Sequence, residues 1–207
     1  MLCRFIFFIA SIASVQAGTI SFDLQAESLK DGSGTALSVN GLVILVADTS
    51  QNGFATILEG SSLALNSSLN AGDDRVLARF DLTTNNIPGF LFENPSITYG
   101  SGWDIGDPLA LLWFPTLTTA SSTADAGTSY GFFSGPPLNG SDPWITPADG
   151  SSAYKLYFNT TDGANIPGTH AANLGNASLT VAAIPEPSRA LLGIIGLTAL
   201  GLRRRRR

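Results

Sequence analysis

The stretch TISFDL at residues 19–24 decides the fold class, because apolar and polar residues alternate along it without a break. In an extended strand, Ile20, Phe22 and Leu24 lie on one face, and the polar residues between them lie on the other. Such a pattern is typical of a sheet that has one buried face and one solvated face. The chain therefore begins its folded part with a half-buried β-strand.

The same alternation recurs at three further places in the chain. We expect inward-facing residues at Val76, Ala78, Phe80 and Leu82, at Tyr154, Leu156 and Phe158, and at Ala177, Leu179 and Val181. Two short runs, 42–47 and 109–114, are apolar throughout and predict strands that are buried on both faces.

Clusters of Gly, Asn, Asp, Ser and Pro separate these strands and have the composition of turns. We expect irregular connections at 120–131 and 134–150, and residues 63–69 could form a short helix. The sum predicts one mainly β domain over residues 18–184, a single antiparallel β-sandwich of the jelly-roll-like kind.

The end of the sequence carries three parts in a fixed order. Pro185, Glu186 and Pro187 come first, an apolar run follows at 190–202, and five arginines close the chain: Arg203, Arg204, Arg205, Arg206 and Arg207. Proline breaks a helix, apolar residues partition into hydrocarbon, and an arginine block stays on the cytoplasmic side of a membrane as a stop-transfer signal. Residues 185–207 resemble the C-terminal sorting signal of PEP-CTERM proteins. The resemblance implies export, a short transmembrane helix, and recognition by an exosortase-type transpeptidase.

Two other interpretations of this segment remain open, a plain membrane anchor and a buried core helix. A helix over 190–202 would rise about 20 Å, which is short of the roughly 30 Å hydrocarbon core. Marginal length suits a segment that is processed. Five adjacent arginines fit a core helix poorly because they repel one another.

The other end of the sequence predicts export independently. Arg4 is followed by an apolar run at 5–15 and by the small-residue pattern Val15-Gln16-Ala17, which marks residues 1–17 as a signal peptide. Cys3, the only cysteine, would be removed with it. The mature protein would then have neither a disulfide nor a cysteine nucleophile.

Charge is unevenly distributed along the chain. Residues 18–184 hold four basic residues against fifteen acidic ones, a net charge of −11, although the whole chain carries −5. Nucleic acid is excluded as a partner, because its phosphates require lysine and arginine. The body would also be repelled by anionic lipid and anionic polysaccharide.

One motif in the body has the spacing of metal ligands. Asp48, Ser50, Asn52 and Glu59 occupy loop positions one, three, five and twelve, with Gly53 at position six. Oxygen ligands at these positions suit Ca²⁺. Apart from this calcium, no cofactor is expected. The alternative interpretation is a polar turn after a strand, with Glu59 exposed to solvent, because the preceding residues are strand-like where a calcium-binding EF-hand has a helix.

Other constellations for chemistry are weaker. His170 is the only histidine, and no partner for a catalytic base can be named for it. Glu59, Glu93, Asp104 and Asp107 could supply carboxylate pairs, but they fit the surface of an acidic domain equally well. Trp103 and Trp144, flanked by Gly, Asp and Pro, could form a loop platform for sugar rings, whereas Trp113 belongs to an apolar run and is expected in the core.

Three classes of function follow. The first is a non-enzymatic protein of the cell surface or extracellular matrix. It would be held transiently in the inner membrane by its tail and then processed by the transpeptidase. The second is a carbohydrate-binding module, with exopolysaccharide as partner and calcium as an aid. The third is a hydrolase, for which the sequence offers no nucleophile and base pair.

Overall fold

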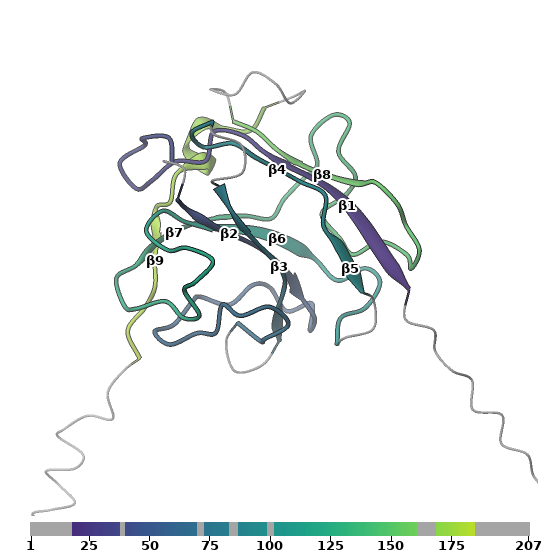
Figure 1. The fold of residues 1–207 in the computed structure, drawn as a ribbon, viewed down its shortest axis with the longest axis horizontal. Helices are drawn as coiled ribbons and strands as arrows, with labels where there is room; N and C mark the ends of the chain where they lie inside the picture. Colours follow the sequence, from purple (N-terminus) through teal and green to yellow (C-terminus); the bar gives the residue numbers. More distant parts are fainter. Residues whose placement is uncertain are drawn as a thin grey trace, which may run out of the picture.

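The computed structural model describes residues 18–37, 40–69, 73–82, 87–98, 102–160 and 169–184. These residues form two β-sheets that lie one above the other, with loops beneath the lower sheet (Figure 1). The expectation of a mainly β protein is confirmed. The signal peptide at 1–17 and the sorting segment at 185–207 lie outside the described residues.

The larger sheet has five strands in the order β3-β2-β6-β7-β9, all antiparallel to their neighbours. The strands are β2 (Leu42–Asp48), β3 (Asp74–Asp81), β6 (Leu109–Phe114), β7 (Ser129–Phe133) and β9 (Leu179–Thr180). The two apolar runs of the sequence, now β2 and β6, lie side by side in it, and both are buried along their whole length, as their composition predicts.

The smaller sheet is built around β1 (Thr19–Ala26). β4 (Leu91–Glu93) and β5 (Ser96–Thr98) pair with its two halves, and the amide of Phe22 donates to the carbonyl of Pro95 between them at 2.9 Å. They are therefore one antiparallel strand that is broken near Pro95, since proline cannot donate to a ladder.

β8 (Tyr154–Phe158) also pairs with β1, and this pair is parallel. The expectation of a purely antiparallel sandwich is wrong at this point. A tight hairpin would have forced an antiparallel pair, but β8 reaches β1 only after a long connection from the other sheet, which leaves its direction open.

The main core fills the space between the two sheets. The inward residues of β1, Ile20, Phe22, Leu24 and Ala26, meet the alternate residues Val43, Leu45 and Ala47 of β2 and Leu109, Leu111 and Trp113 of β6. Leu156 and Phe158 of β8 complete it, as the alternation at 154–158 predicts. Two sheets packed in this way bury one face each, which is the arrangement of a β-sandwich.

A second apolar cluster lies on the opposite face of the larger sheet. Here the other residues of β2 and β6, among them Ile44 and Leu112, contact a loop layer whose buried members are Ile57, Leu63, Leu69 and Ala124. The larger sheet is covered on both faces, which explains why β2 and β6 contain no polar residue facing solvent. Residues 63–69 form turns in this layer and not a helix.

Two strand assignments from the sequence need correction. The pairing of β3 with β2 shifts between Leu45, which faces Ala78, and Val46, which faces Val76, so Leu77 is an extra residue in the ladder. Val76 therefore packs in the loop-side cluster, while Ala78 and Phe80 pack between the sheets. In the predicted strand at 177–182, β9 comprises only Leu179 and Thr180, and Leu179, which the alternation places inward, is 44% exposed.

Candidate functional site

Three buried aspartates stand at one end of the larger sheet. Asp48 ends β2, Asp74 begins β3 opposite it, and Asp107 precedes β6 by two residues. Their exposed fractions are 1%, 0% and 1%. Burial of a carboxylate is costly unless hydrogen bonds replace water. The bonds that each side chain accepts therefore indicate what it does.

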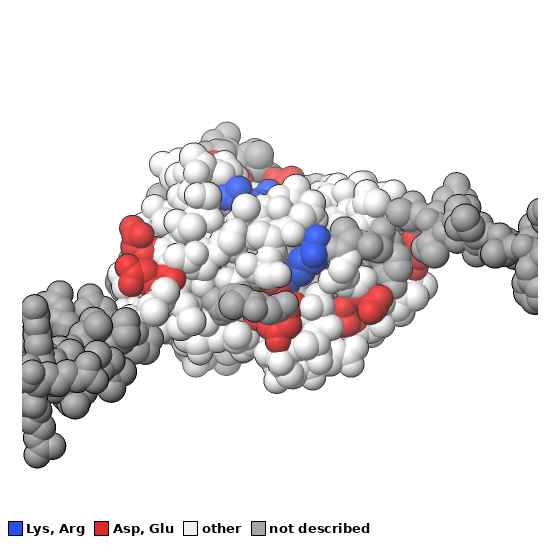
Figure 2. Space-filling model, turned by 90° about the horizontal axis from the view of Figure 1, so that it is seen from below, with Lys and Arg blue, Asp and Glu red and all other residues white. Residues whose placement is uncertain are grey.

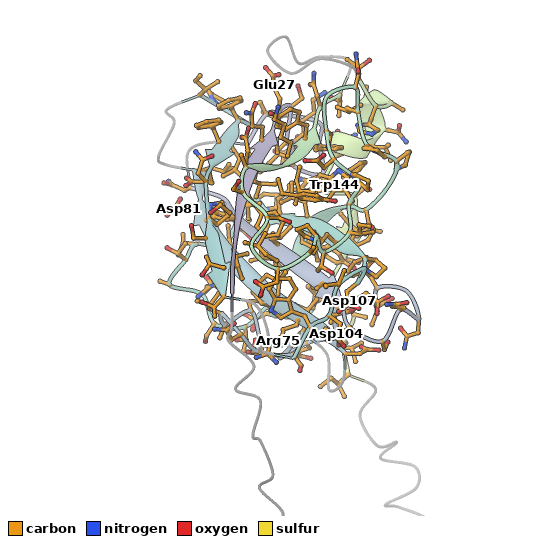
Figure 3. The ribbon with its side chains drawn as sticks, turned by 90° about the vertical axis from the view of Figure 1, so that its right-hand side faces the viewer. Glu27, Arg75, Asp81, Asp104, Asp107 and Trp144 are labelled. Atoms are coloured by element: carbon orange, nitrogen blue, oxygen red, sulfur yellow. The ribbon has the colours of Figure 1, made fainter. Side chains whose placement is uncertain are left out.

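Asp48 and Asp107 hold two loops against the sheet end. The carboxylate of Asp48 accepts hydrogen bonds from the backbone amides of Ser50 at 3.2 Å and Gly53 at 2.8 Å. The carboxylate of Asp107 accepts from the amide of Asp104 at 2.6 Å and from the side-chain amide of Gln51 at 3.2 Å. Asp104 and Asp107 lie next to each other at this end of the molecule in Figure 3. Both buried carboxylates act as turn anchors.

Asp74 is satisfied at one oxygen only. Its Oδ2 accepts from the amide of Ala55 at 2.9 Å, whereas its buried Oδ1 accepts no hydrogen bond from any residue that the structure describes. Burial and, to a smaller extent, the nearby charges of Asp73 and Asp48 raise the pKa of Asp74 to about 6. Burial of this kind disfavours the ionised form. Asp74 is therefore the aspartate of the cluster whose charge is least compensated by hydrogen bonds.

Two side chains of the loop with metal-ligand spacing are bound to Asp73, which lies outside that loop. The side chains of Ser50 and Asn52 both donate to Oδ2 of Asp73, each at 2.8 Å, and these bonds lower the pKa of Asp73. Glu59 is exposed, and its amide donates to the carbonyl of Ala182 at the other end of the loop layer.

This geometry favours the polar-turn interpretation of the motif. In the part of the chain that the structure describes, no three His, Cys, Asp or Glu residues are arranged to hold a metal ion. Asp48 serves the backbone of its own turn, and Glu59 is exposed as that interpretation expects.

The two loop tryptophans are buried, so the interpretation of Trp103 and Trp144 as an open sugar platform is wrong. Their exposed fractions are 2% and 4%, and both belong to the core between the sheets. Trp144, labelled in Figure 3, meets Phe133 edge to face, with ring centroids 5.0 Å apart. Both residues do lie on loops, but their rings pack into the core and not on the surface.

His170 serves the packing of the same region. Its Nδ1 lies 3.0 Å from the carbonyl oxygen of Asn159, and its Nε2 lies 3.2 Å from that of Pro136. The ring also contacts Phe133 and Phe158, with centroids 4.6 and 5.5 Å away. Both nitrogens face backbone oxygens, which is the environment of a side chain that connects two chain segments.

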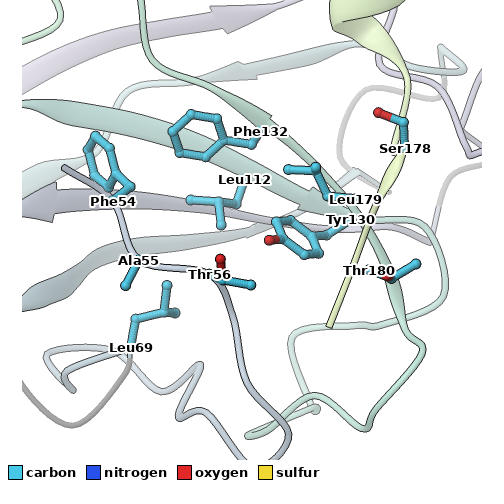
Figure 4. Close-up of a pocket in the computed structure, with 10 residues that line it drawn as sticks. All are labelled: Phe54, Ala55, Thr56, Leu69, Leu112, Tyr130, Phe132, Ser178, Leu179 and Thr180. Atoms are coloured by element: carbon cyan, nitrogen blue, oxygen red, sulfur yellow. The ribbon is translucent and has the colours of Figure 1, made fainter. Parts of the chain in front are cut away.

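A cleft on the loop side of the larger sheet was not foreseen from the sequence. It has a volume of about 370 Å³ and lies between the loop at 54–56 and strand β9 (Figure 4). Phe54 and Phe132 form one wall, with ring centroids 5.3 Å apart, and Tyr130 forms the floor, where burial raises its pKa. Its residues come from segments far apart in the chain, so no local motif could reveal it.

The surface of the body is acidic, in agreement with its composition. On the face covered by the loop layer, acidic side chains form several separate groups and basic side chains are fewer (Figure 2). Arg79 of β3 donates to the carbonyl of Ser121 in the loop layer. At least this cation therefore connects a strand to a loop.

Comparison with known proteins does not add a function. The sequence matches no family model, and no curated protein or solved structure is significantly similar to it. Within the described part of the chain, no helix is both long and apolar enough to cross a membrane. The sorting residues Pro185, Glu186 and Pro187 and the arginines of 203–207 lie outside that part, so their roles stay predictions.

Proposed function

We propose that this protein is a non-enzymatic component of a bacterial cell surface or extracellular matrix, exported and then sorted through residues 185–207. The observation that carries the proposal is the order of the three parts in that segment: Pro185-Glu186-Pro187, the apolar run at 190–202, and the arginines of 203–207. In this role the chain is the substrate of an exosortase-type transpeptidase and contributes no catalytic residue to the reaction.

The body is suited to act as cargo. The described residues from Ile20 to Val181 already form two apolar clusters, and we expect this core to fold without either apolar end of the chain. The first strand starts at one side of the molecule, and the described chain ends at Ile184 on the other side (Figure 1). A membrane segment after Ile184 could insert without unfolding the sandwich.

The finer features of the fold belong to the same proposal. We regard the two sheets as a jelly-roll-like sandwich and residues 190–202 as a short transmembrane helix that holds the protein in the inner membrane before processing. Marginal helix length keeps that state transient, and the arginines hold the end of the chain in the cytoplasm. After processing, the body would reside at the cell surface or in the matrix.

The test is sorting in a host that exports the protein. Replacement of Pro185, Glu186 and Pro187 by alanine should leave export intact and trap the protein in the inner membrane, because export depends on the first residues and sorting on the motif. Cell fractionation and immunoblotting measure both steps. An unrelated exported reporter that carries residues 185–207 is the matched control, and it should reach the surface only with the intact motif. Normal surface delivery of the triple-alanine variant would refute the proposal.

A further inference from the structure

A row of three side chains crosses the outer face of the smaller sheet. Gln25 of β1 lies opposite Phe92 of β4 on one side and opposite Tyr157 of β8 on the other. Their strand neighbours Leu24, Ala26, Leu91, Leu156 and Phe158 point into the core, so the three point outward. Neighbouring strands are about 4.8 Å apart, which places the two aromatic residues roughly 10 Å apart on one surface.

The rings are accessible and one of them is fixed. Phe92 is 42% exposed, and Tyr157 is half-buried. The hydroxyl of Tyr157 donates to Oδ2 of Asp23 at 2.9 Å, although its backbone is paired with Gln25. Because Asp23 precedes Gln25 by two residues in β1, the Tyr157 ring leans along the sheet instead of standing upright. The side-chain amide of Gln25 donates to Oδ1 of Asp23 at 2.9 Å, so the three polar groups hold one another.

The outer face has one lysine beside the carboxylates of Asp23 and Asp142, which both raise the pKa of Tyr157. Lys155 is paired with Asp23 in the register of β1 and β8 and is exposed. Further along β1, hydroxyl groups face each other in the pairs Ser21 with Ser96 and Thr19 with Thr98. The face thus offers hydrogen-bond donors and acceptors beside two aromatic rings, while the body as a whole, at −11, repels anions.

We propose that this outer sheet face binds an uncharged, extended polysaccharide, with Phe92 and Tyr157 each stacking on a sugar ring. The separation of the two residues is comparable with the repeat of two sugars in an extended β-linked chain. Aromatic rings bind the apolar faces of sugars, and Asp23, Gln25 and Lys155 would pair with the hydroxyl groups at the rim. The inference rests on the surface role proposed above and names the matrix component that the protein holds.

The β8 edge of this sheet does not offer a second copy of the chain a place to add a strand. Strand addition would need an open edge, but the loop at 141–142 covers β8: Asp142 accepts from the amide of Lys155 at 2.7 Å, and Ser141 accepts from that of Tyr157 at 3.1 Å. An edge covered in this way does not recruit another strand. The exposed face of the sheet, and not its edge, is what β8 presents to a partner.

Affinity electrophoresis of the full chain, purified in a non-ionic detergent, tests the proposal. The gels contain hydroxyethyl cellulose, galactomannan, dextran or the anionic polysaccharide alginate. We expect retardation by hydroxyethyl cellulose or galactomannan and none by alginate. Phe92→Ala and Tyr157→Ala should each weaken binding about tenfold, since each removes one stacking ring. Tyr157→Phe keeps the ring and should lose less, which protects the test against a variant that misfolds.

Phe54→Ala is the matched control, because it removes a ring of the same size from the cleft on the other sheet. It should bind as well as the wild type. Three outcomes would each overturn the proposal. The first is no retardation in any uncharged gel, the second is equal binding by Phe92→Ala and wild type, and the third is a loss of binding confined to Phe54→Ala. The outcome is separable from sorting: Phe92→Ala should still reach the surface, and the purified variant with alanine at 185–187 should still bind.

Discussion

Asp48 and Asp74 stand opposite each other in the β2–β3 ladder, so two carboxyl groups with exposed fractions of 1% and 0% share one end of the larger sheet. Like charges directly opposite each other destabilise an antiparallel pair. Asp48 is compensated by the amides of Ser50 and Gly53, whereas Asp74 has a buried oxygen that accepts no bond from a described residue. Protonation of Asp74 therefore relieves the pair.

The stability of the protein should fall as the pH rises from about 4 to above 6. The pKa of Asp74 is raised from 3.8 to about 6, so between these values the folded state binds more protons than the unfolded state. Stability then decreases with pH, by an amount on the order of 3 kcal/mol over the window.

Asp74→Asn should remove this pH dependence and stabilise the protein at pH 7, because a neutral amide replaces the buried charge. Urea unfolding at pH 4.5 and pH 7 measures the effect. Asp125→Asn, at an exposed position, is the control and should leave the pH profile unchanged. A profile for Asp74→Asn equal to that of the wild type would show that Asp74 is ionised without cost.

Asp48→Ala should destabilise the protein by about 2 kcal/mol or more whether or not calcium is present. The substitution leaves the amides of Ser50 and Gly53 without their acceptor, and each lost bond of a backbone donor to a buried carboxylate is costly. Thermal melts with calcium, magnesium and a chelator measure the effect. If calcium alone raised the melting temperature of the wild type, and Asp48→Ala abolished that rise, the polar-turn interpretation would fail.

The strands that could be predicted from the sequence are those with a local signature. The alternation at 19–24 and 154–158 identified β1 and β8, and the apolar runs at 42–47 and 109–114 identified β2 and β6. In each case the spacing of apolar residues indicates whether one face or both faces of the strand are buried. No sequence pattern within β8 indicates its parallel direction, because that direction depends on the path of a distant connection.

Other features are decided by contacts that no local pattern contains. β7 was missed because Gly131 interrupts its apolar residues, and that glycine is required by the ring of Trp113 from the neighbouring strand. The extra residue Leu77 shifts the alternation of β3 within an otherwise regular strand. Trp144 was assigned to the surface from its flanking prolines, which correctly mark a loop but do not say which way the loop folds.

For the candidate site, the sequence identified the Asp48 turn but not its partners. Asp73 and Asp74, which complete the cluster, follow Asp48 by about 25 residues and reach it only through the pairing of β3 with β2. The row of Phe92, Gln25 and Tyr157 is equally nonlocal, since each residue comes from a different strand. Sequence patterns reveal periodicity within a strand, but not the residues that pairing places beside it.

Gly131→Ala should be among the most destabilising single substitutions in the chain. A methyl group at this position would lie 1.9 Å from Cε2 of Trp113, whose ring is fully buried and donates to the carbonyl of Lys30 at 3.1 Å. The ring cannot shift without loss of that bond, so we expect a loss of roughly 3 kcal/mol or a failure to fold.

Gly135→Ala is the matched control for this prediction. Its added methyl group would lie 3.4 Å from the ring of Phe133, an ordinary contact distance, so it should change stability by less than about 1 kcal/mol. Denaturant unfolding of the two variants measures the difference. Similar stabilities would mean that the sheet opens easily beside Trp113.

The hydroxyl group of Tyr157 should ionise at a higher pH than that of an ordinary tyrosine. Burial, the hydrogen bond to Asp23 and the charge of that carboxylate together raise the pKa of Tyr157 to about 12, because the phenolate would lose its bond and face a like charge. Ultraviolet titration of wild type and Tyr157→Phe gives the contribution of this residue as a difference. Asp23→Asn should lower the pKa towards 10, since the amide removes the charge but can still accept the bond. Unfolding in alkali is followed in parallel by circular dichroism, so that only ionisation of the folded state is counted. Ionisation of Tyr157 near pH 10 in the wild type would mean that its bond to Asp23 does not form in solution. The leaning ring on the outer sheet face would then have no support.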